Sequence, residues 1–289
     1  MRIVLALAVL LSTTACGALP GSSGKVDVAA GFYPLAWVAE RVGGNLVSVT
    51  NLTQPGAEPH DLELNVRETA AIAEADVVVH ESGFQPAVDD GIAQNATGTV
   101  VDVAGPDFQT SNAPEIRPDN PHFWLDPLLM ADLGDAVADA LVEADPKHAD
   151  TYRGNAALLR GDMQQLDLAY AEGLAHCERE TVVVSHDAFG YLDRYGLRFA
   201  PILGLSPGAE PTPADLSRLQ DLIRADGITT VFSETLVSPK LAETLASDLG
   251  IRSLVLDPIE GLTADTANDD YLSLMRDNLA AIEEANGCR

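Results

Sequence analysis

The stretch that decides the fold is residues 145–177, DPKHADTYRGNAALLRGDMQQLDLAYAEGLAHC, near the middle of the chain. Asp145 followed by Pro146 is a favourable pair for the N-cap and first turn of a helix. From there apolar residues recur at alternating steps of four and three, the pattern of a helix with one buried face. They are Tyr152, Ala156, Leu159, Met163, Leu166, Tyr170 and Leu174. The pattern predicts one continuous helix over residues 146 to about 174, roughly 43 Å long at about 1.5 Å per residue.

A helix of this length exceeds the usual size of an element within one domain. It could form half of a coiled coil. Alternatively, it could run along the backs of two lobes and join them stiffly. We favour the second interpretation.

Runs rich in Val that resemble strands alternate with helical patterns on both sides of this helix. The runs cover 26–30, 46–52, 76–80, 98–103, 181–185, 197–202, 229–233 and 252–256. Helical patterns lie at 34–43, 66–75, 127–143, 212–226 and 238–249. Such alternation is typical of parallel sheets that are covered on both faces. We therefore predict an α/β protein of two lobes, each a mostly parallel sheet flanked by helices, bridged by one long helix. The N-terminal lobe would cover 26–145, the connecting helix 146–176 and the C-terminal lobe 177–289.

Composition sets limits on the partners. The chain has 289 residues, 46% of them hydrophobic, which is enough for one large or two medium domains. Its formal net charge is −27. Nucleic-acid binding depends on basic side chains that neutralise phosphates, so this balance argues strongly against a nucleic acid as partner. An acidic surface is compatible with drawing in cations, although many exported proteins are also acidic.

The first residues, MRIVLALAVLLSTTAC, contain one basic residue, an apolar run over 3–11 and then small residues. This run is too short to span a bilayer and fits the core of a secretion signal. The Cys after Thr14 and Ala15 is similar to a bacterial lipoprotein signal, although Thr13 stands where Leu is usual. We expect a signal peptide at 1–15, lipidation of Cys16 and a tether over 16–25. These features predict a protein outside the cytoplasm that is attached to the membrane, at the cell surface or in the periplasm. The alternative is an ordinary signal peptide with an incidental Cys.

Two further cysteines remain. Cys177 follows the long helical stretch, and Cys288 is the next-to-last residue of the sequence. Outside the cytoplasm, two such cysteines more often pair than stay free. A disulfide between Cys177 and Cys288 is therefore possible, and it would fix the C-terminal helix.

Four potential metal ligands share one kind of position. His60 lies in the turn after the second strand-like run, His122 lies in the loop NPHFWLDP, and His186 and Asp257 directly follow TVVVS and RSLVL. In open α/β sheets, ligands bind beyond the carboxyl ends of the strands, so two groups from each lobe would face each other across a cleft. Any one of these histidines could simply be a hydrogen-bonding residue at a strand end. The occurrence of three histidines and one aspartate in equivalent places points to a metal site.

Three imidazoles and one carboxylate form a tetrahedral set that suits zinc. Manganese prefers more oxygen ligands, so the set favours Zn²⁺ over Mn²⁺.

Five stretches resemble those of a known family, the solute-binding proteins of bacterial ABC importers for zinc and manganese (ZnuA/TroA type). The matching stretches are PGAEPHDLEL, NPHFWLDP, VVVSHDAFGYLDRYGL, FSETLVSPKLAETLA and LDPIEGL. They cover nearly all of the chain after the signal, in the order of the family. The resemblance implies two α/β lobes bridged by one long helix, with a metal ion held between them.

The resemblance also implies roles for individual residues. It assigns His60, His122, His186 and Asp257 as ligands, and His186 stands where manganese-binding members commonly have Glu, which favours zinc. Glu58 and Glu234 match acidic positions of the family and would orient imidazoles. A plain solvated carboxylate is an alternative for Glu58. Many zinc receptors have a His-rich loop before the second ligand, and this chain has no histidine there.

These observations predict an extracytoplasmic receptor that captures Zn²⁺ between its lobes and delivers it to an ABC permease driven by a cytoplasmic ATPase. We expect a monomer. The alternative is an exported zinc-dependent hydrolase, which would use three protein ligands and leave a fourth position for water. Asp257 would fill that position, and Glu58 would be its candidate general base. An additional adhesin role leaves no mark in the sequence.

Overall fold

The structure is a computed structural model that describes residues 24–111 and 116–289. The expected signal peptide, Cys16 and most of the tether lie outside the described residues. Within the described residues, no helix combines the length and the hydrophobicity that crossing a membrane requires.

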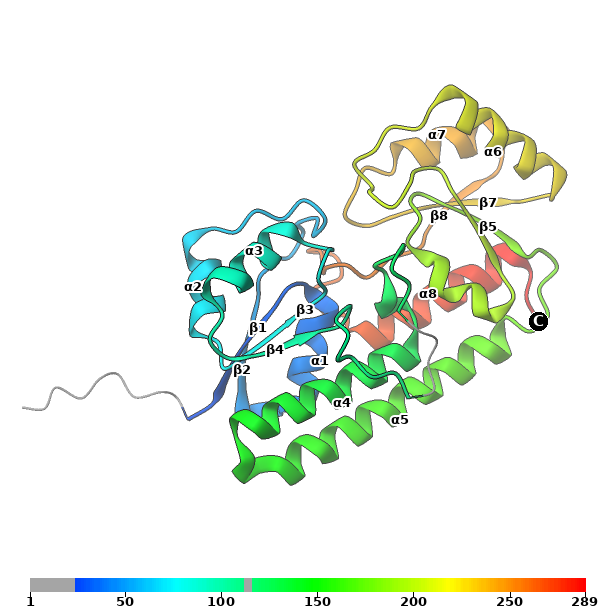
Figure 1. The fold of residues 1–289 in the computed structure, drawn as a ribbon. Helices are drawn as coiled ribbons and strands as arrows, with labels where there is room; N and C mark the ends of the chain where they lie inside the picture. Colours follow the sequence, from blue (N-terminus) through cyan, green and yellow to red (C-terminus); the bar gives the residue numbers. More distant parts are fainter. Residues whose placement is uncertain (1–23, 112–115) are drawn as a thin grey trace, which may run out of the picture.

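The first lobe contains a parallel sheet with the strand order β2-β1-β3-β4. Its strands are β1 (Val26–Ala30), β2 (Val47–Asn51), β3 (Val77–His80) and β4 (Thr99–Asp102). One face is covered by α1 (Tyr33–Gly43) and α4 (Pro127–Ala144), the other by α2 (Val66–Glu74) and α3 (Pro86–Asn95) (Figure 1). Two short 3₁₀ helices, η1 (Gly44–Leu46) and η2 (Phe123–Leu125), lie in the connections.

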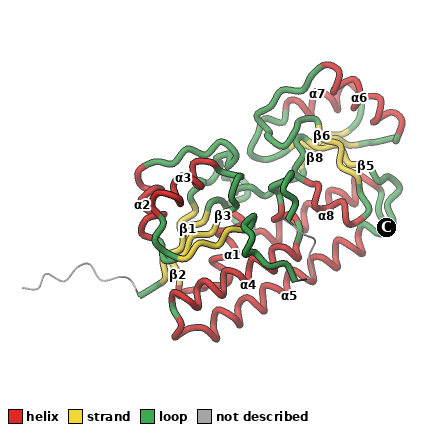
Figure 2. The backbone as a smooth tube through the Cα atoms, in the orientation of Figure 1, coloured by secondary structure: helices red, strands yellow, loops and turns green. Residues whose placement is uncertain are grey.

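The second lobe repeats this topology, with a parallel sheet in the order β6-β5-β7-β8. Its strands are β5 (Thr181–Val184), β6 (Arg198–Pro201), β7 (Thr230–Ser233) and β8 (Arg252–Val255). Helices α6 (Pro213–Ala225) and α7 (Lys240–Leu249) cover one face, α8 (Tyr271–Asn286) covers the other, and the 3₁₀ helix η4 (Phe189–Tyr195) follows β5. Figure 2 shows the two sheets as separate layers between helices. The predicted α/β fold of two lobes is thus confirmed.

Strand residues alternate between two cores because successive side chains point to opposite faces of a sheet. In β5, Val182 and Val184 join a large apolar cluster, while Val183 joins the cluster under α6 and α7. In β3, Val79 joins the same large cluster, and Val78 packs under α2 and α3. The large cluster includes residues of both lobes and of the long helix. The two lobes therefore share one continuous core.

The predicted long helix is present as η3 (Pro146–His148) followed by α5 (Ala149–Gly173), which runs beneath both lobes (Figure 1). All seven residues of the predicted apolar stripe are buried. Asn155 Nδ2 donates a hydrogen bond to the Val42 carbonyl of α1 at 2.8 Å. The Tyr170 hydroxyl donates to the Met275 carbonyl of α8 at 2.7 Å. The helix thus packs within the chain against both lobes, which is the arrangement favoured over a coiled coil.

The pairing of Cys177 with Cys288 is confirmed, because the two residues form a disulfide. The bond joins the segment after α5 to the segment after α8, across a sequence separation of 111 residues.

Removal of this disulfide should lower the stability of the fold. A cross-link over a loop of this size restricts the unfolded chain, and its loss typically costs about 2–5 kcal/mol. The double variant Cys177→Ser/Cys288→Ser should therefore unfold at a lower urea concentration than the oxidised wild type. Reductant should shift the wild-type midpoint and leave that of the variant unchanged. Equal midpoints for the oxidised wild type and the variant would contradict the prediction.

Candidate metal centre

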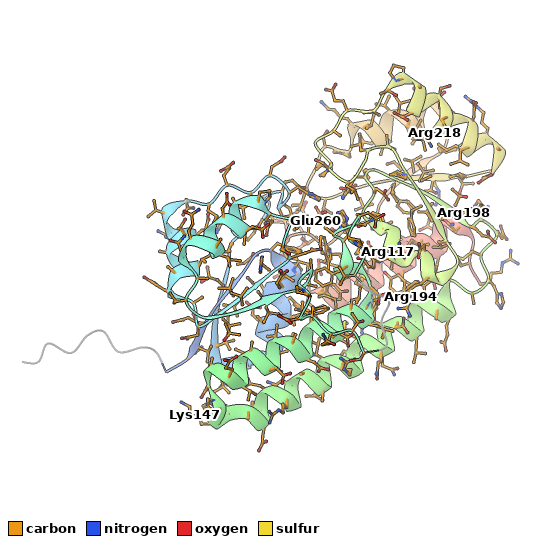
Figure 3. All side chains as sticks on the ribbon, viewed as in Figure 1. Arg117, Lys147, Arg194, Arg198, Arg218 and Glu260 are labelled. Atoms are coloured by element: carbon orange, nitrogen blue, oxygen red, sulfur yellow. A yellow bond between two sulfur atoms is a disulfide. The ribbon has the colours of Figure 1, made fainter. Side chains whose placement is uncertain are left out.

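Four side chains from distant parts of the chain meet between the two lobes. One ligand atom from each of His60, His122, His186 and Glu260 lies within 4.8 Å of all the others. Glu260 Oε1 is 3.3 Å from Nε2 of His60, 3.2 Å from Nε2 of His122 and 3.4 Å from Nε2 of His186. Figure 3 labels Glu260 in the region between the lobes. Three imidazole nitrogens and a carboxylate oxygen are a donor set that fits zinc.

The topology explains why these residues meet. His60 lies in the loop after β2, His122 directly precedes η2, His186 follows β5, and Glu260 follows β8. The strand order changes direction between β1 and β3 in the first sheet and between β5 and β7 in the second. The loops beyond the carboxyl ends of the strands diverge at such a point and leave room for a ligand. The lobes thus place their strand ends on opposite sides of one site.

The expectation that Asp257 supplies the carboxylate is not met, because Glu260 occupies that place. Asp257 Oδ2 accepts a hydrogen bond from the Thr235 hydroxyl at 3.1 Å, and its Oδ1 accepts one from the Ile259 amide at 2.7 Å. Burial raises the pKa of Asp257 to about 6. Ile259 has a φ of 59°, a left-handed conformation that is rare for a β-branched residue. Asp257 therefore stabilises a tight turn, and this turn brings Glu260 to the histidines.

Asn120 positions His122. Its Oδ1 lies 2.8 Å from His122 Nδ1 and 3.0 Å from the His122 amide nitrogen. An amide oxygen can only accept, so Nδ1 donates to Asn120 and the other ring nitrogen, Nε2, is directed towards the other three ligand atoms. The sequence reasoning missed Asn120, although its place two residues before a histidine in DNPH is a signal for such a local hydrogen bond.

Glu234 positions the His186 ring, as Asn120 positions that of His122. Its Oε1 lies 2.8 Å from His186 Nδ1 and accepts a hydrogen bond from the His186 amide at 3.1 Å. Both side chains are almost fully buried. The carboxylate thus orients the imidazole, as the sequence reasoning expected for Glu234.

Glu58 contacts the backbone rather than an imidazole. Its Oε1 accepts a hydrogen bond from the His60 amide at 3.2 Å, and its Oε2 is buried without a hydrogen-bond partner among the described residues. Burial, with the nearby charge of Glu260, raises the pKa of Glu58 to about 7. The His60 ring packs edge-on against Phe84, with 4.7 Å between the ring centroids. In this geometry Glu58 fixes the loop that carries His60.

The segment that carries His122 is tied to the second lobe. Trp124 Nε1 donates to the Pro258 carbonyl at 2.7 Å, and the Tyr271 hydroxyl donates to the Trp124 carbonyl at 2.5 Å. The Arg194 guanidinium contacts the buried Asp126 carboxylate at 3.1 Å. His122, His186 and Glu260 therefore belong to one closely connected region.

In Glu260, His186 and His122, burial and the hydrogen-bonded neighbours shift the pKa in opposite directions. Burial raises the pKa of Glu260, but hydrogen bonds with His122, His186 and His60 outweigh it and hold the pKa well below its usual value. Burial lowers the pKa of His186, and its hydrogen bonds with Glu234 and Glu260 more than reverse this, raising it to about 10. Burial dominates at His122 and lowers its pKa to about 4. Of these two histidines, His186 is therefore the one that is protonated near neutral pH. Its Nε2 lies 3.1 Å from Nε2 of His122.

Comparisons with known proteins agree with this geometry. The chain is 32% identical over 302 aligned residues to the zinc-binding lipoprotein AdcA of Streptococcus pneumoniae, covering 98% of this chain and 60% of that protein. It is 28% identical to the high-affinity zinc uptake system protein ZnuA of Bacillus subtilis, covering 93% of this chain and 90% of that protein. The chain thus spans about 60% of the length of the streptococcal relative.

Solved structures show the same fold. The crystal structure of the Zn(II)-bound ZnuA-like domain of Streptococcus pneumoniae AdcA matches with a TM-score of 0.78 and 31% identity, over 91% of this chain and 99% of that one. The laminin-binding protein Lmb of Streptococcus agalactiae, described as having adhesin and metal-transporting activity, matches with a TM-score of 0.79 and 30% identity, over 89% of this chain and 98% of that one. The family model described as zinc-uptake complex component A periplasmic (ZnuA) matches residues 28–285. With eight parallel strands in two described lobes and a three-histidine, one-carboxylate group between them, the chain belongs to the ZnuA family.

Proposed function

We propose that this protein is an extracytoplasmic receptor that captures Zn²⁺ between its lobes and delivers it to an ABC-type importer. The observation that carries the proposal is the convergence of His60, His122, His186 and Glu260 within 4.8 Å. The names of the relatives, a zinc-binding lipoprotein and a zinc uptake protein, support zinc as the substrate. Three neutral imidazoles and one carboxylate would leave a bound zinc ion with a net charge of +1.

The donor set favours zinc over manganese, because nitrogen ligands suit zinc and manganese prefers oxygen. Isothermal titration of the purified protein should show one tightly bound Zn²⁺ per chain and binding of Mn²⁺ weaker by at least about a hundredfold. Absence of zinc binding, or equal affinities for the two metals, would count against the proposal.

A hydrolase has no support. A catalytic zinc keeps one position open for water, whereas four protein donors surround the proposed ion here. The family is described as a component of a zinc-uptake complex, which is a binding role and not an enzymatic one.

For the partners, we propose a permease of the ABC type with its cytoplasmic ATPase, and attachment to the membrane through a lipid on Cys16. The lipoprotein name of the streptococcal relative and the cysteine after the apolar run support the anchor. We also propose that the receptor acts as a monomer, with lobes bounded as the sequence predicts. Mass spectrometry of the mature N-terminus and membrane fractionation of Cys16→Ser test the anchor, since a variant that stays in the membrane fraction would argue against it.

Zinc binding should release about one proton near neutral pH. The ligand form of an imidazole is neutral, whereas a His186 pKa of about 10 means that this side chain is protonated before zinc binds. The apparent affinity should therefore rise about tenfold per pH unit from about pH 7 to 8. Titration calorimetry at one pH in buffers of different ionisation enthalpy measures the proton count. A count of zero at pH 7.5 would contradict the assignment of the proton to His186.

Loss of the Glu234 carboxylate should weaken zinc binding by about 10–100-fold, the usual effect of removing a group that orients a ligand. Glu234→Ala leaves His186 Nδ1 without its acceptor and lowers the pKa of His186, so fewer protons should be released. Glu243→Gln, which removes an exposed carboxylate from α7 in the same lobe, is the matched control. Equal zinc affinities for the two variants would argue against the orienting role of Glu234.

A further inference from the structure

A cavity of about 510 Å³ opens beside the metal centre. Its polar lining consists of His60, Glu81, Ser82, Arg117, Asp119 and Ser206. The side chain of His60 is 12% exposed, whereas those of His122, His186 and Glu260 are fully buried. The cavity therefore reaches the metal centre at the ligand that is most accessible.

Glu81 on the cavity wall is a buried acid that the metal centre does not use. The residue is 5% exposed, and its Oε2 is buried without a hydrogen-bond partner among the described residues. Burial, together with the charges of Asp102 and Asp89, raises the pKa of Glu81 well above its usual value. A buried carboxyl oxygen without a partner is unfavourable unless a proton or a cation satisfies it. A cation bound in the cavity would satisfy this carboxyl group.

The turn that carries Glu81 is held in a fixed position next to His60. The Ser82 amide donates to Asp102 Oδ1 at 3.0 Å, and the Gly83 amide donates to Asp89 Oδ2 at 2.8 Å. The same turn ends at Phe84, whose ring packs against the His60 imidazole. Glu81 and His60 are therefore positioned by one connected piece of structure.

Arg117 is the cation in the cavity lining, and its charge is already balanced. Its guanidinium lies 2.9 Å from Asp193 Oδ1, donates to the Gly190 carbonyl at 2.9 Å and stacks over the Tyr191 ring (Figure 3 labels Arg117 between the lobes). Oxygen atoms of Glu81, Ser82, Asp119 and Ser206 remain as possible donors to a cation, and such hard oxygen donors suit a hydrated divalent ion.

We propose that this cavity is an outer cation-binding station, with Glu81 as its principal ligand, which hydrated zinc occupies on its way to and from the buried centre. A zinc ion with six waters fills roughly 180 Å³ at about 30 Å³ per water, so it fits the cavity. Zinc would bind the Glu81 carboxylate, lose part of its water there and pass to His60. The proposal deepens the proposed function and rests on it.

Stopped-flow kinetics test the proposal once one-to-one zinc binding by the wild type has been established. Zinc uptake is followed by competition with a chromophoric chelator, and zinc loss is followed after mixing with excess EDTA. In Glu81→Gln both rates should fall about tenfold while the equilibrium affinity changes less than about twofold, because a station on the path changes rates and not the end states. Glu63→Gln, which removes an exposed carboxylate from the loop that carries His60, should leave both rates unchanged.

Unchanged rates in Glu81→Gln would overturn the proposal. So would a loss of affinity that appears in the dissociation rate alone, because Glu81 would then support the buried centre itself. Anomalous diffraction from wild-type crystals soaked in excess zinc gives an answer even if the variant fails to fold. A second peak in the cavity, about 2.0–2.2 Å from a Glu81 oxygen, supports the station, and a cavity without a peak contradicts it.

Discussion

Replacement of Glu260 by Gln is expected to reduce zinc affinity by about 100–1,000-fold, or about 3–4 kcal/mol. Glu260 Oε1 contacts all three imidazoles, and its carboxylate would supply the single negative charge of the ligand set. Glutamine keeps the volume and removes that charge, so the loss reports on coordination rather than on packing. Titration calorimetry or chelator competition measures the effect.

Asp257→Asn is the matched control, since it removes a buried carboxylate three residues earlier in the same loop. Asparagine retains an oxygen that can accept from the Ile259 amide, as Asp257 does. We expect the zinc affinity of Asp257→Asn to stay within about tenfold of the wild type. Removing a group that only supports a ligand costs about 10–100-fold, and we expect the smaller value here. A larger loss in Asp257→Asn than in Glu260→Gln would return the ligand role to Asp257.

The second large effect is expected for His122→Ala and His186→Ala, each of which should weaken zinc binding by at least about a hundredfold. Both side chains are fully buried, so a water molecule cannot easily take the place of the lost nitrogen. His60→Ala should cost less, because the 12% exposed side chain of His60 borders a cavity from which water can reach the ion.

Thermal unfolding of each histidine variant, measured without zinc, separates loss of a ligand from loss of the fold. An unchanged affinity in His122→Ala or His186→Ala would remove these residues from the ligand set. A larger effect for His60→Ala than for either buried histidine would contradict the distinction between buried and accessible ligands.

Much of the fold could be predicted from local patterns. All eight predicted strands are present within one or two residues of their expected bounds, because runs rich in Val between turns specify buried parallel strands. The long helix was visible in its apolar stripe, every residue of which is buried. Helix α3 was missed, since its sequence PAVDDGIAQN contains two adjacent acids and a glycine and has little apolar periodicity.

The site was predictable in part. Three histidines after strand ends meet as expected, because the ends of parallel strands lie at one edge of a sheet. The carboxylate was assigned to Asp257 by the same rule, and that assignment failed at a tight turn. The left-handed conformation of Ile259 redirects the chain so that Glu260 points to the histidines. A sequence does not reveal such a turn at a β-branched residue, although Glu260 stood in the same stretch, LDPIEGL, as a second acid.

The most direct test of the central claim is a crystal structure of the zinc-loaded protein with anomalous data at the zinc edge. We predict one strong peak between the lobes, about 2.0–2.1 Å from Nε2 of His60, His122 and His186 and about 2.0–2.2 Å from a carboxylate oxygen of Glu260. Zinc bound through Asp257 instead of Glu260, or through fewer than three of these histidines, would contradict the account.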